Sequence, residues 1–516
     1  SRAQPPTPRR AAPPSTAAAE PSIRGTIPTA GADPGDVDPT ADPGSDQSDG
    51  GRTARVGQRP ARQDGDLEPA EPAAVQDGIV EVGEPEAPED GSDPTRIDAR
   101  DPDDVAVFES PPAGFDPLLF DAEVEPILDR RPARLFQFEP YDPKGIRVGS
   151  FVLFPEAEIG ATWLSNVFRT SSPRTDTVYD VRPAARLVSN WRTHALEFRA
   201  SGLASRFAEF SSENEKAYLL EMRGRIDISK RTNVEALANR EVTQESRSSA
   251  TASRSASTPA EVATSRMAAT LNHRFNRLAI QLRGSVVETD YGAVEDAGGT
   301  ILTNDDRDVR TTEEAIRLRW EFKPTLFGFI EYALNQRDYK TASLSDDLRR
   351  DSSGDRTRVG VSFGNTSQRL RGELSVGYGR QKPDDRRLQE IEGVVIDANV
   401  AYRMSALTSF LLTARSDVAE TSTAGSGGAL SRQIGIEARH ALQRHLIATA
   451  GLAYAVQDYA GIDLDEREWR TSLGLEYFVN REITLFGRYQ HVAFDSTDVS
   501  RNYNSDEVRF GIRVRQ

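Results

Sequence analysis

Cysteine is absent from this 516-residue chain, which excludes disulfides and thiolate metal sites. No apolar run approaches the roughly eighteen residues that a membrane-spanning helix needs. Histidine occurs only five times, and no HExxH, GxSxG or Walker glycine loop is present. On these grounds the sequence predicts no enzyme, no cofactor and no metal centre.

Apolar and aromatic residues are scarce in the first quarter of the chain. Residues 1–130 hold 11 basic and 28 acidic side chains, whereas the remainder is nearly balanced at 53 to 52. The same segment carries 21 of the 30 prolines and only three aromatics. So little apolar surface does not offset the entropy cost of folding, and residues 1–100 are predicted to form a disordered acidic arm. Its negative charge disfavours binding to nucleic acid. Because the chain opens on Pro/Ala-rich sequence, we expect a mature form from which an export signal has been removed.

Apolar residues return after residue 100, interspersed with prolines. The stretch "FDPLLFDAEVEPILDRRPARLFQF" (115–138) is an example. We interpret residues 101–147 as a semi-ordered tether that touches the folded domain. A plug or a partner-docking segment is the alternative.

From residue 148 the sequence alternates between apolar and polar residues. In "RLAIQLRGSVVETDYG" (277–292), Leu278 and Leu282 fall on one parity and Arg283 on the other. A strand places alternate side chains on opposite faces, so one face is apolar and the other is charged. The alternating segments run about ten to fourteen residues, longer than the five or six usual in soluble sheets and long enough to cross a bilayer. The apolar face is therefore predicted to contact lipid.

Short polar breaks recur about every forty residues, and longer hydrophilic stretches lie between them. The breaks are "SNW" (189–191), "SKR" (229–231), "FNR" (275–277), "KPT" (323–325), "NTSQ" (365–368), "MSA" (404–406), "LQR" (442–444) and "VNR" (479–481). Eight hairpins plus one strand at each end predict about eighteen strands, with both chain ends on the short-turn side. The fold class is therefore all-β: an antiparallel up-and-down transmembrane barrel over residues 148–516. Outer-membrane barrels have short periplasmic turns, so we expect the arm in the periplasm.

Aromatic residues also cluster near both ends of these segments, as interfacial girdles do. Near the short turns are Trp191, Phe275, Trp320, Phe327, Phe363, Phe410, Tyr477 and Phe478. Toward the long loops are Tyr179, Tyr291, Tyr339, Tyr378, Tyr454, Tyr459 and Tyr489.

Odd or even position along each predicted strand assigns candidate residues to the lumen face or the lipid face of the barrel. The predicted lumen lining is Arg223, Arg225, Arg283, Arg317, Arg319, Glu321, Arg371, Glu373, Arg509 and Arg513. The predicted lipid-facing residues are Leu278, Ile280, Leu282, Ile316, Leu318, Trp320, Phe510 and Ile512. Cross-strand salt bridges would stabilise such a lumen, and opposed rows of charge would create a transverse field.

Two acidic stretches lie in predicted loops, "NDDRD" (304–308) and "SDD" (345–347). Hard oxygen ligands of this kind suit a divalent cation. A solvated acidic loop is the interpretation we prefer.

Three stretches resemble a known family. They are "GIRVGSFVLFPEAEIGATWLSNVFR" (145–169), "YDVRPAARLVSNW" (179–191) and "LEYFVNREITLFGRYQH" (475–491). They are similar to Gram-negative outer-membrane proteins of the family named "putative β-barrel porin 2". The resemblance covers roughly residues 145–516 and implies a barrel in the outer membrane. It supplies no catalytic residues and no defined transported substrate.

The sequence therefore predicts a passive porin-like channel for small hydrophilic solutes. One alternative is a closed structural or partner-binding surface barrel; another is an accessory barrel for polysaccharide export, which rows of inward aromatics would favour. The expected partners are outer-membrane lipid, small hydrophilic solutes and a possible periplasmic partner of the acidic arm.

Overall fold

The computed structural model describes residues 141, 143–191, 193–249, 251–253, 255–364, 369–419 and 421–516. The predicted arm of residues 1–100, and the tether or plug of 101–147 apart from its last few residues, lie outside this range. No helix in the described part of the chain is long and apolar enough to cross a membrane. The two helices it contains are single 3-10 turns, η2 (Ser211–Glu213) and η3 (Val499–Arg501).

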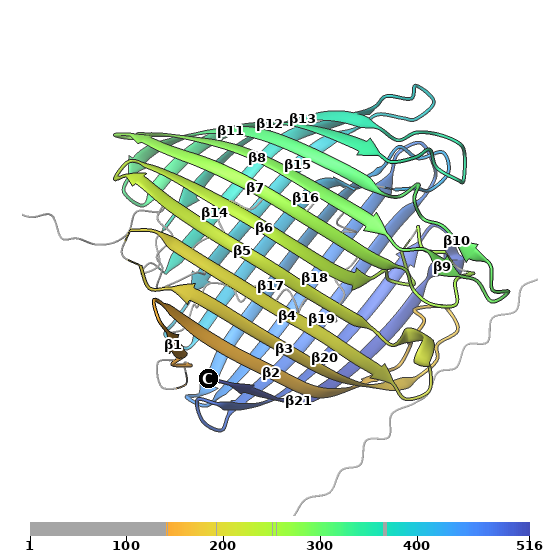
Figure 1. Ribbon diagram of the computed structural model, residues 1–516, viewed down its shortest axis with the longest axis horizontal. Coiled ribbons are helices and arrows are strands. Elements are labelled where there is room, and N and C mark those ends of the chain that lie inside the picture. Colours follow the sequence, from red (N-terminus) through yellow and green to blue (C-terminus); the bar gives the residue numbers. More distant parts are fainter. Residues whose placement is uncertain are drawn as a thin grey trace, which may run out of the picture. The chain divides into compact units, whose positions relative to one another are not determined.

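Eighteen long strands form one continuous wall in the described residues (Figure 1). They are β2 (Phe151–Leu164), β3 (Asp176–Ser189), β4 (Ala195–Phe207), β5 (Lys216–Ser229), β6 (Thr232–Gln244), β7 (Glu261–Phe275), β8 (Leu278–Tyr291), β11 (Val309–Lys323), β12 (Leu326–Tyr339), β13 (Ser352–Phe363), β14 (Leu370–Pro383), β15 (Ile391–Arg403), β16 (Thr408–Ala419), β17 (Ala429–Gln443), β18 (Leu446–Tyr459), β19 (Asp465–Phe478), β20 (Ile483–Ser496) and β21 (Tyr503–Arg515).

Each strand of the wall pairs antiparallel with the next, and β2 pairs with β21 to close it. Ile159 lies opposite Ile512 at this closing seam. Closure satisfies every backbone group of the wall internally, as the hydrocarbon of a bilayer requires. The predicted fold class, a closed antiparallel barrel of about eighteen strands, is confirmed. The remaining short strands lie outside the wall sequence: β1 (Ile146–Val148) pairs with the start of β2, and β9 (Val294–Glu295) pairs with β10 (Ile301–Leu302) in a loop.

Seven of the eight predicted short breaks fall between paired strands, and the eighth, "NTSQ" (365–368), lies outside the described residues. In the break "FNR", Asn276 has a φ of 57°, a left-handed conformation that asparagine tolerates better than most residues. The nine other connections lie at the opposite end of the wall, although the β18–β19 connection is as short as the turns. Because the first and last connections are of the long-loop kind, β2 begins and β21 ends on the short-turn side.

The two faces of the wall differ in chemistry. Along β11, Arg317 is 4% exposed, whereas its neighbour Leu318 is 39% exposed. Arg317 reaches Glu373 of β14 across the two intervening strands. Side chains meet over such a span only where the sheet curves toward them, so the charged parity lies on the concave side. The apolar parity lies on the convex side.

The predicted aromatic bands are partly wrong. Exposed rings occur at both ends of the wall, at Trp191, Phe275, Trp320 and Tyr477 near the turns and at Tyr179, Tyr378 and Tyr489 toward the loops. However, Phe327, Tyr339, Tyr459 and Phe478 are buried. Phe478 directly follows the exposed Tyr477, so strand alternation turns its ring to the concave side. The sequence distance from a turn correctly predicted the end of the wall at which each ring lies. The parity of the residue along its strand decides whether the ring lies on the concave or the convex side.

Candidate channel lining

A dense ionic network covers the concave side of β11–β15. We call Arg317, Glu331, Arg358, Glu373 and Asp397 the β11–β15 cluster. Arg317 donates to Glu331 at 2.7 Å and to Glu373 at 2.9 Å. Arg358 contacts Glu331 on its other side and reaches Asp397 at 3.3 Å. Every member therefore has at least one partner of opposite charge.

Strand register creates this network. Arg317, Glu331 and Arg358 lie directly opposite one another on three consecutive strands. Opposite charges in this position stabilise a sheet. The next residue in the row is Gly377, where a Cβ would lie 2.8 Å from the Arg358 side chain. The missing side chain leaves room for Arg358 to extend over β14 to Asp397.

A second row of charges extends the network toward the loops. Glu313 of β11 accepts from Arg283 of β8 at 2.9 Å and from Arg356 of β13 at 3.2 Å. Aromatic rings support the arginines from the wall. The guanidinium of Arg317 lies 4.3 Å from the centroid of Phe329, within the range of a cation–π interaction.

A separate network lies at the closing seam. We call Glu158, Asp180, Glu476, Arg509 and Arg513 the seam cluster. Arg509 donates to Asp180 at 2.7 Å and Glu158 at 3.2 Å, while Arg513 donates to Glu158 at 2.5 Å and Glu476 at 2.9 Å. The two arginines of the last strand therefore hold β2, β3 and β19 together on the concave side.

The other predicted lumen residues are placed as follows. Arg223 pairs with Glu221, and Arg225 with Asp227, each two residues along β5. Glu321 contacts Arg274 near the short turns. Arg371 lies two residues before Glu373, partly buried at the short-turn end of β14. Arg319 is buried, and its guanidinium lies 4.7 Å from the centroid of the Phe327 ring. None of these five predicted residues belongs to the two clusters.

Sequence reasoning missed most of the carboxylates in these networks. Those not named from the sequence are Glu158, Asp180, Glu313, Glu331, Asp397 and Glu476. Parity could have found Glu331, which lies two residues after the inward Phe329. Each cluster mixes both signs, with two arginines and three carboxylates, so neither cluster is a row of one sign. The transverse field across the lumen stays a prediction.

The family named "putative β-barrel porin 2" matches residues 139–516. The chain belongs to this family. It is therefore a porin-type β-barrel of the outer membrane, in agreement with the resemblance noted in its sequence.

Solved outer-membrane barrels are only distantly similar to this porin-family chain. OpdK of Pseudomonas aeruginosa is 11% identical with a TM-score of 0.36, and the match covers 70% of this chain and 98% of that one. A BenF-like porin from Pseudomonas fluorescens Pf-5 is 8% identical with a TM-score of 0.38, covering 70% and 99%. OccK2 (OpdF) of P. aeruginosa, solved with glucuronate, is 9% identical with a TM-score of 0.39, covering 71% and 97%. No curated protein matches the sequence. Similarities this low do not identify a solute for this porin.

The predicted lipid-facing residues of the porin are mostly exposed. Leu282, Ile316, Leu318, Trp320, Phe510 and Ile512 are exposed, and Leu278 and Ile280 are partly buried. All eight lie on the apolar parity of their strands. Their contact with lipid remains a prediction.

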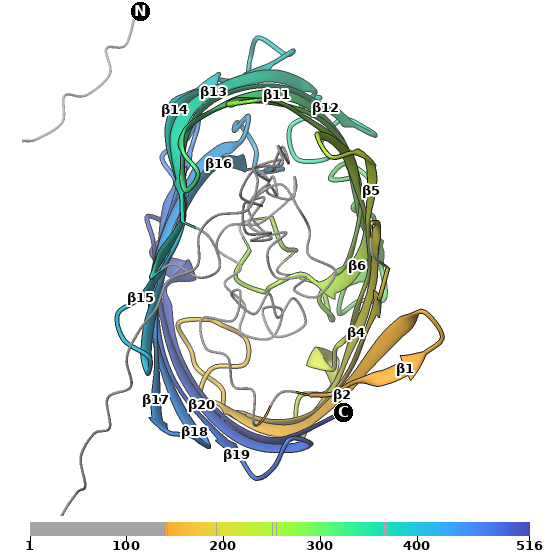
Figure 2. The same cartoon turned by 90° about the vertical axis from the view of Figure 1, so that its left-hand side faces the viewer.

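The loop between β6 and β7, residues 245–260, is tied to several other loops. Arg307 of the β8–β11 loop donates to Glu245, with Nη1 and Oε2 3.0 Å apart. Arg247 contacts Glu213, and Arg501 of the β20–β21 loop donates to the Ser248 carbonyl at 2.7 Å. Figure 2 shows this loop inside the outline of the wall. The loop therefore narrows the long-loop mouth.

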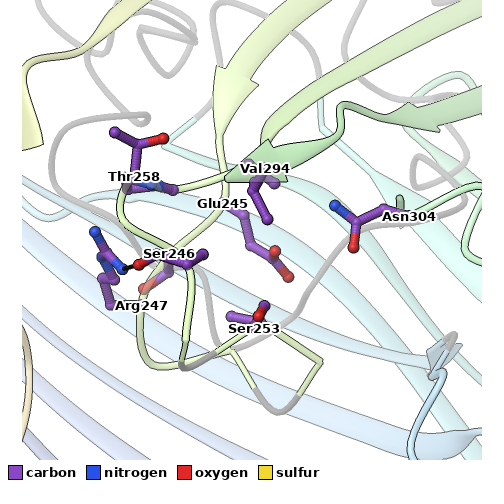
Figure 3. Close-up of a pocket in the computed structure, with 11 residues that line it drawn as sticks. Glu245, Ser246, Arg247, Ser253, Thr258, Val294 and Asn304 are labelled. Carbon is purple, nitrogen blue, oxygen red and sulfur yellow. Dashed lines mark hydrogen bonds between the residues drawn. The ribbon is translucent and has the colours of Figure 1, made fainter. Parts of the chain in front are cut away.

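Figure 3 shows a pocket within this loop, lined by Glu245, Arg247, Thr258 and Asn304 among others. Its interior volume is about 10 Å³, which is the space of a single water molecule. The pocket therefore belongs to the packing of the loop and is too small to hold a solute.

The stretch 304–308, predicted to be a solvated loop, contains two buried aspartates. Asp306 is buried and accepts from the Leu344 backbone N–H at 2.8 Å, while Asp308 is buried and accepts from Lys340 at 3.0 Å. These hydrogen bonds to Asp308, and to Asp305, raise the pKa of Lys340. The expectation of solvation is therefore wrong for Asp306 and Asp308, because a backbone N–H and a lysine of another loop contact their carboxylates, whereas Asp305 is exposed.

Asp346 connects the β12–β13 loop with the β16–β17 loop. It accepts from Arg350 at 2.8 Å and from the Gly425 backbone N–H at 2.9 Å, and Arg350 also donates to the Ser426 carbonyl at 3.0 Å. Burial alone would raise the pKa of Asp346, but these hydrogen bonds outweigh it and hold the pKa below its ordinary value. Within the described residues, no three His, Asp or Glu side chains are arranged to hold a metal ion.

Proposed function

We propose that this porin-family barrel is a passive channel for small hydrophilic solutes across the outer membrane. The observation that carries the proposal is the pair of ionic clusters on the concave side of a closed eighteen-stranded wall. Barrels of about sixteen to eighteen strands are wide enough to leave an aqueous passage. The residues assigned to the lumen by parity would line that passage.

The pairing of charges favours a channel that admits polar solutes without a strong preference for either sign of charge. Arg317 and Arg509 each contact two carboxylates. Fully paired arginines present little net potential to a passing ion. Selectivity would therefore come from arginines that are more exposed even though each pairs with a carboxylate, such as Arg199 beside Glu197 and Arg439 beside Glu476, whose side chains are 24% and 25% exposed.

The proposed orientation places the short turns in the periplasm. Outer-membrane barrels have short periplasmic turns and longer external loops. Both β2 and β21 reach the short-turn side, so the acidic arm of residues 1–100 would extend into the periplasm. A periplasmic partner of this arm is part of the same proposal.

Swelling of liposomes that contain the purified full chain tests this function. Sugars and zwitterionic amino acids should enter at rates that fall as solute size rises, since the route is a water-filled passage. Empty liposomes, and liposomes containing the heat-unfolded protein, are the controls. Entry no faster than into empty liposomes, from protein shown to be folded, would refute the channel and favour the closed, partner-binding barrel.

A further inference from the structure

Lysine and arginine side chains gather at the short-turn end of the wall. This end consists of the stretches 144–150, 189–195, 228–232, 275–278, 322–326, 363–370, 402–408, 442–446 and 477–483. Together these stretches hold eleven lysines and arginines but only one carboxylate, Glu482. Nine of the cations are exposed in the described part of the chain: Lys144, Arg147, Lys230, Arg231, Arg277, Lys323, Arg369, Arg444 and Arg481. The surface at this end is therefore strongly positive.

Four of these cations lie on three turns that follow one another around the wall. We call Lys230, Arg231, Arg277 and Lys323 the basic turn patch. They belong to the β5–β6, β7–β8 and β11–β12 turns, which lie at the same end of the wall (Figure 1). Within the described residues, none of the four side chains donates to a carboxylate.

The carboxylates closest in sequence do not neutralise the basic turn patch. Glu321, on the concave parity of β11, contacts Arg274. Asp227, on the concave parity of β5, pairs with Arg225 at 2.7 Å. Both carboxylates therefore belong to the inner side of the wall and have cations of their own.

Exposed arginines at the long-loop end of the convex side have a different environment. Arg380 donates to Asp355 at 2.9 Å, and Arg432 donates to Asp458 at 2.8 Å. These arginines are neutralised by neighbouring strands. The basic turn patch, in contrast, presents its charge to an anion outside the described chain.

Exposed apolar side chains adjoin the patch. Phe322, next to Lys323, is 59% exposed, and Phe275, two residues before Arg277, is 54% exposed. Aromatic rings at such positions prefer the level of the lipid headgroups. Two residues of extended chain span about 7 Å, so the cations of the patch lie at the level of the lipid phosphates.

We infer that the basic turn patch binds the phosphate of an anionic phospholipid, an inference whose choice of leaflet rests on the proposed orientation. Each Lys or Arg near an anionic membrane surface strengthens binding about fivefold. A lipid fits this position better than a soluble anion, because its acyl chains contact the exposed rings while its phosphate contacts the cations. With the short turns in the periplasm, the bound lipid belongs to the periplasmic leaflet.

Native mass spectrometry of the purified full chain in a neutral detergent tests this binding. The probe is phosphatidylglycerol, and phosphatidylcholine with the same acyl chains is the control without net charge. The wild type should bind phosphatidylglycerol about tenfold more tightly than phosphatidylcholine, since several cations contribute. Lys230→Gln/Arg231→Gln/Arg277→Gln/Lys323→Gln should lose most of this preference.

The matched control variant is Lys216→Gln/Lys382→Gln/Arg386→Gln/Arg467→Gln, which removes four exposed cations at the long-loop end. It should keep the preference for phosphatidylglycerol, and heat-modifiable migration should show that both variants have folded. Equal affinity of the wild type for the two lipids would overturn the inference. So would an equal loss in both variants, because the preference would then follow net charge and not the patch.

Glycerol phosphate distinguishes a lipid site from a site for soluble anions, since it carries the phosphate without acyl chains. It should bind about tenfold more weakly than phosphatidylglycerol, because it makes no contact with the exposed rings. Binding as tight as that of the lipid would overturn the assignment to a phospholipid.

Lipid binding is measured whether or not the barrel conducts. A preference that depends on the patch, in a barrel that passes no solute, would refute the proposed function and support the lipid site. No preference in a conducting barrel would refute the lipid site and support the function.

Discussion

The substitution Leu318→Arg tests most directly whether the convex face of the wall contacts lipid. Leu318 is exposed on the convex side of β11, five residues before the short-turn end of the strand at Lys323. With a rise of about 3.3 Å per residue and a tilt of about 40°, it lies about 13 Å from that end. This is close to half of the roughly 25 Å apolar band, so the residue should lie near the bilayer midplane.

Arginine at the midplane of a lipid-facing strand costs about 2–4 kcal/mol, and the cost falls to about 0–1 kcal/mol near the interface. Leu318→Arg should therefore reduce the folding equilibrium constant by about 30- to 700-fold. Leu442→Arg is the matched control. It makes the same substitution at an exposed position one residue from the end of β17.

Denaturant titration of folding into lipid vesicles measures both variants, with heat-modifiable migration as a check that the barrel has formed. The free energies of unfolding of the wild type and of Leu442→Arg should be close together, and that of Leu318→Arg should be clearly lower. Equal losses at both positions would show that depth in a membrane does not set the cost. No loss at Leu318→Arg would show that the convex side does not face lipid.

Three further outcomes are expected. Glu331→Gln should cost about 3–5 kcal/mol in the same titration, since it removes the buried carboxylate that Arg317 and Arg358 share and leaves them only Glu373 and Asp397, whereas the exposed Glu314→Gln should cost far less. The folded-state pKa of Asp346 is lowered, so its stabilising effect is present above the ordinary carboxyl pKa and is lost as pH falls through the lowered value. Hydrogen exchange in residues 421–428 should therefore rise on acidification and should already be high at neutral pH in Asp346→Asn; protection that persists in acid would contradict this. Arg501→Ala should release the β6–β7 loop from its Ser248 contact and increase proteolysis within residues 245–260, and unchanged cleavage would show that the contact does not hold the loop.

Strand positions, turns and faces were predictable because they depend on local alternation. A period of two in "AIRLRWEF" (315–322) is enough to separate Arg317 from Leu318. The eight short breaks were likewise visible as polar interruptions between alternating segments. The count of eighteen strands followed from these breaks alone.

Contacts between strands that are not neighbours were not predictable in this way. Arg317 reaches Glu373 only because the wall curves over β12 and β13. The sequence of a single strand does not show how the sheet curves. The burial of loop residues was missed for a related reason. The sequence around Asp306 is typical of a solvated loop, but the backbone N–H of Leu344, in another loop, donates to its carboxylate. The contacts of Tyr141 were missed because they join distant parts of the chain: its ring stacks on Phe478 of β19, and its carbonyl accepts from Arg515 of β21, 374 residues later.

Recording from single barrels in a planar bilayer tests the central claim, conduction through a charged bore, most directly. Purified full chain should give stable stepwise conductance, and its reversal potential in a salt gradient should shift toward cations in Arg199→Gln/Arg439→Gln, because both arginines are partly exposed on the concave side. Arg467→Gln, which removes an exposed arginine on the convex parity of β19, should leave the reversal potential unchanged. Absence of steps from folded protein, or an equal shift in Arg467→Gln, would contradict the account.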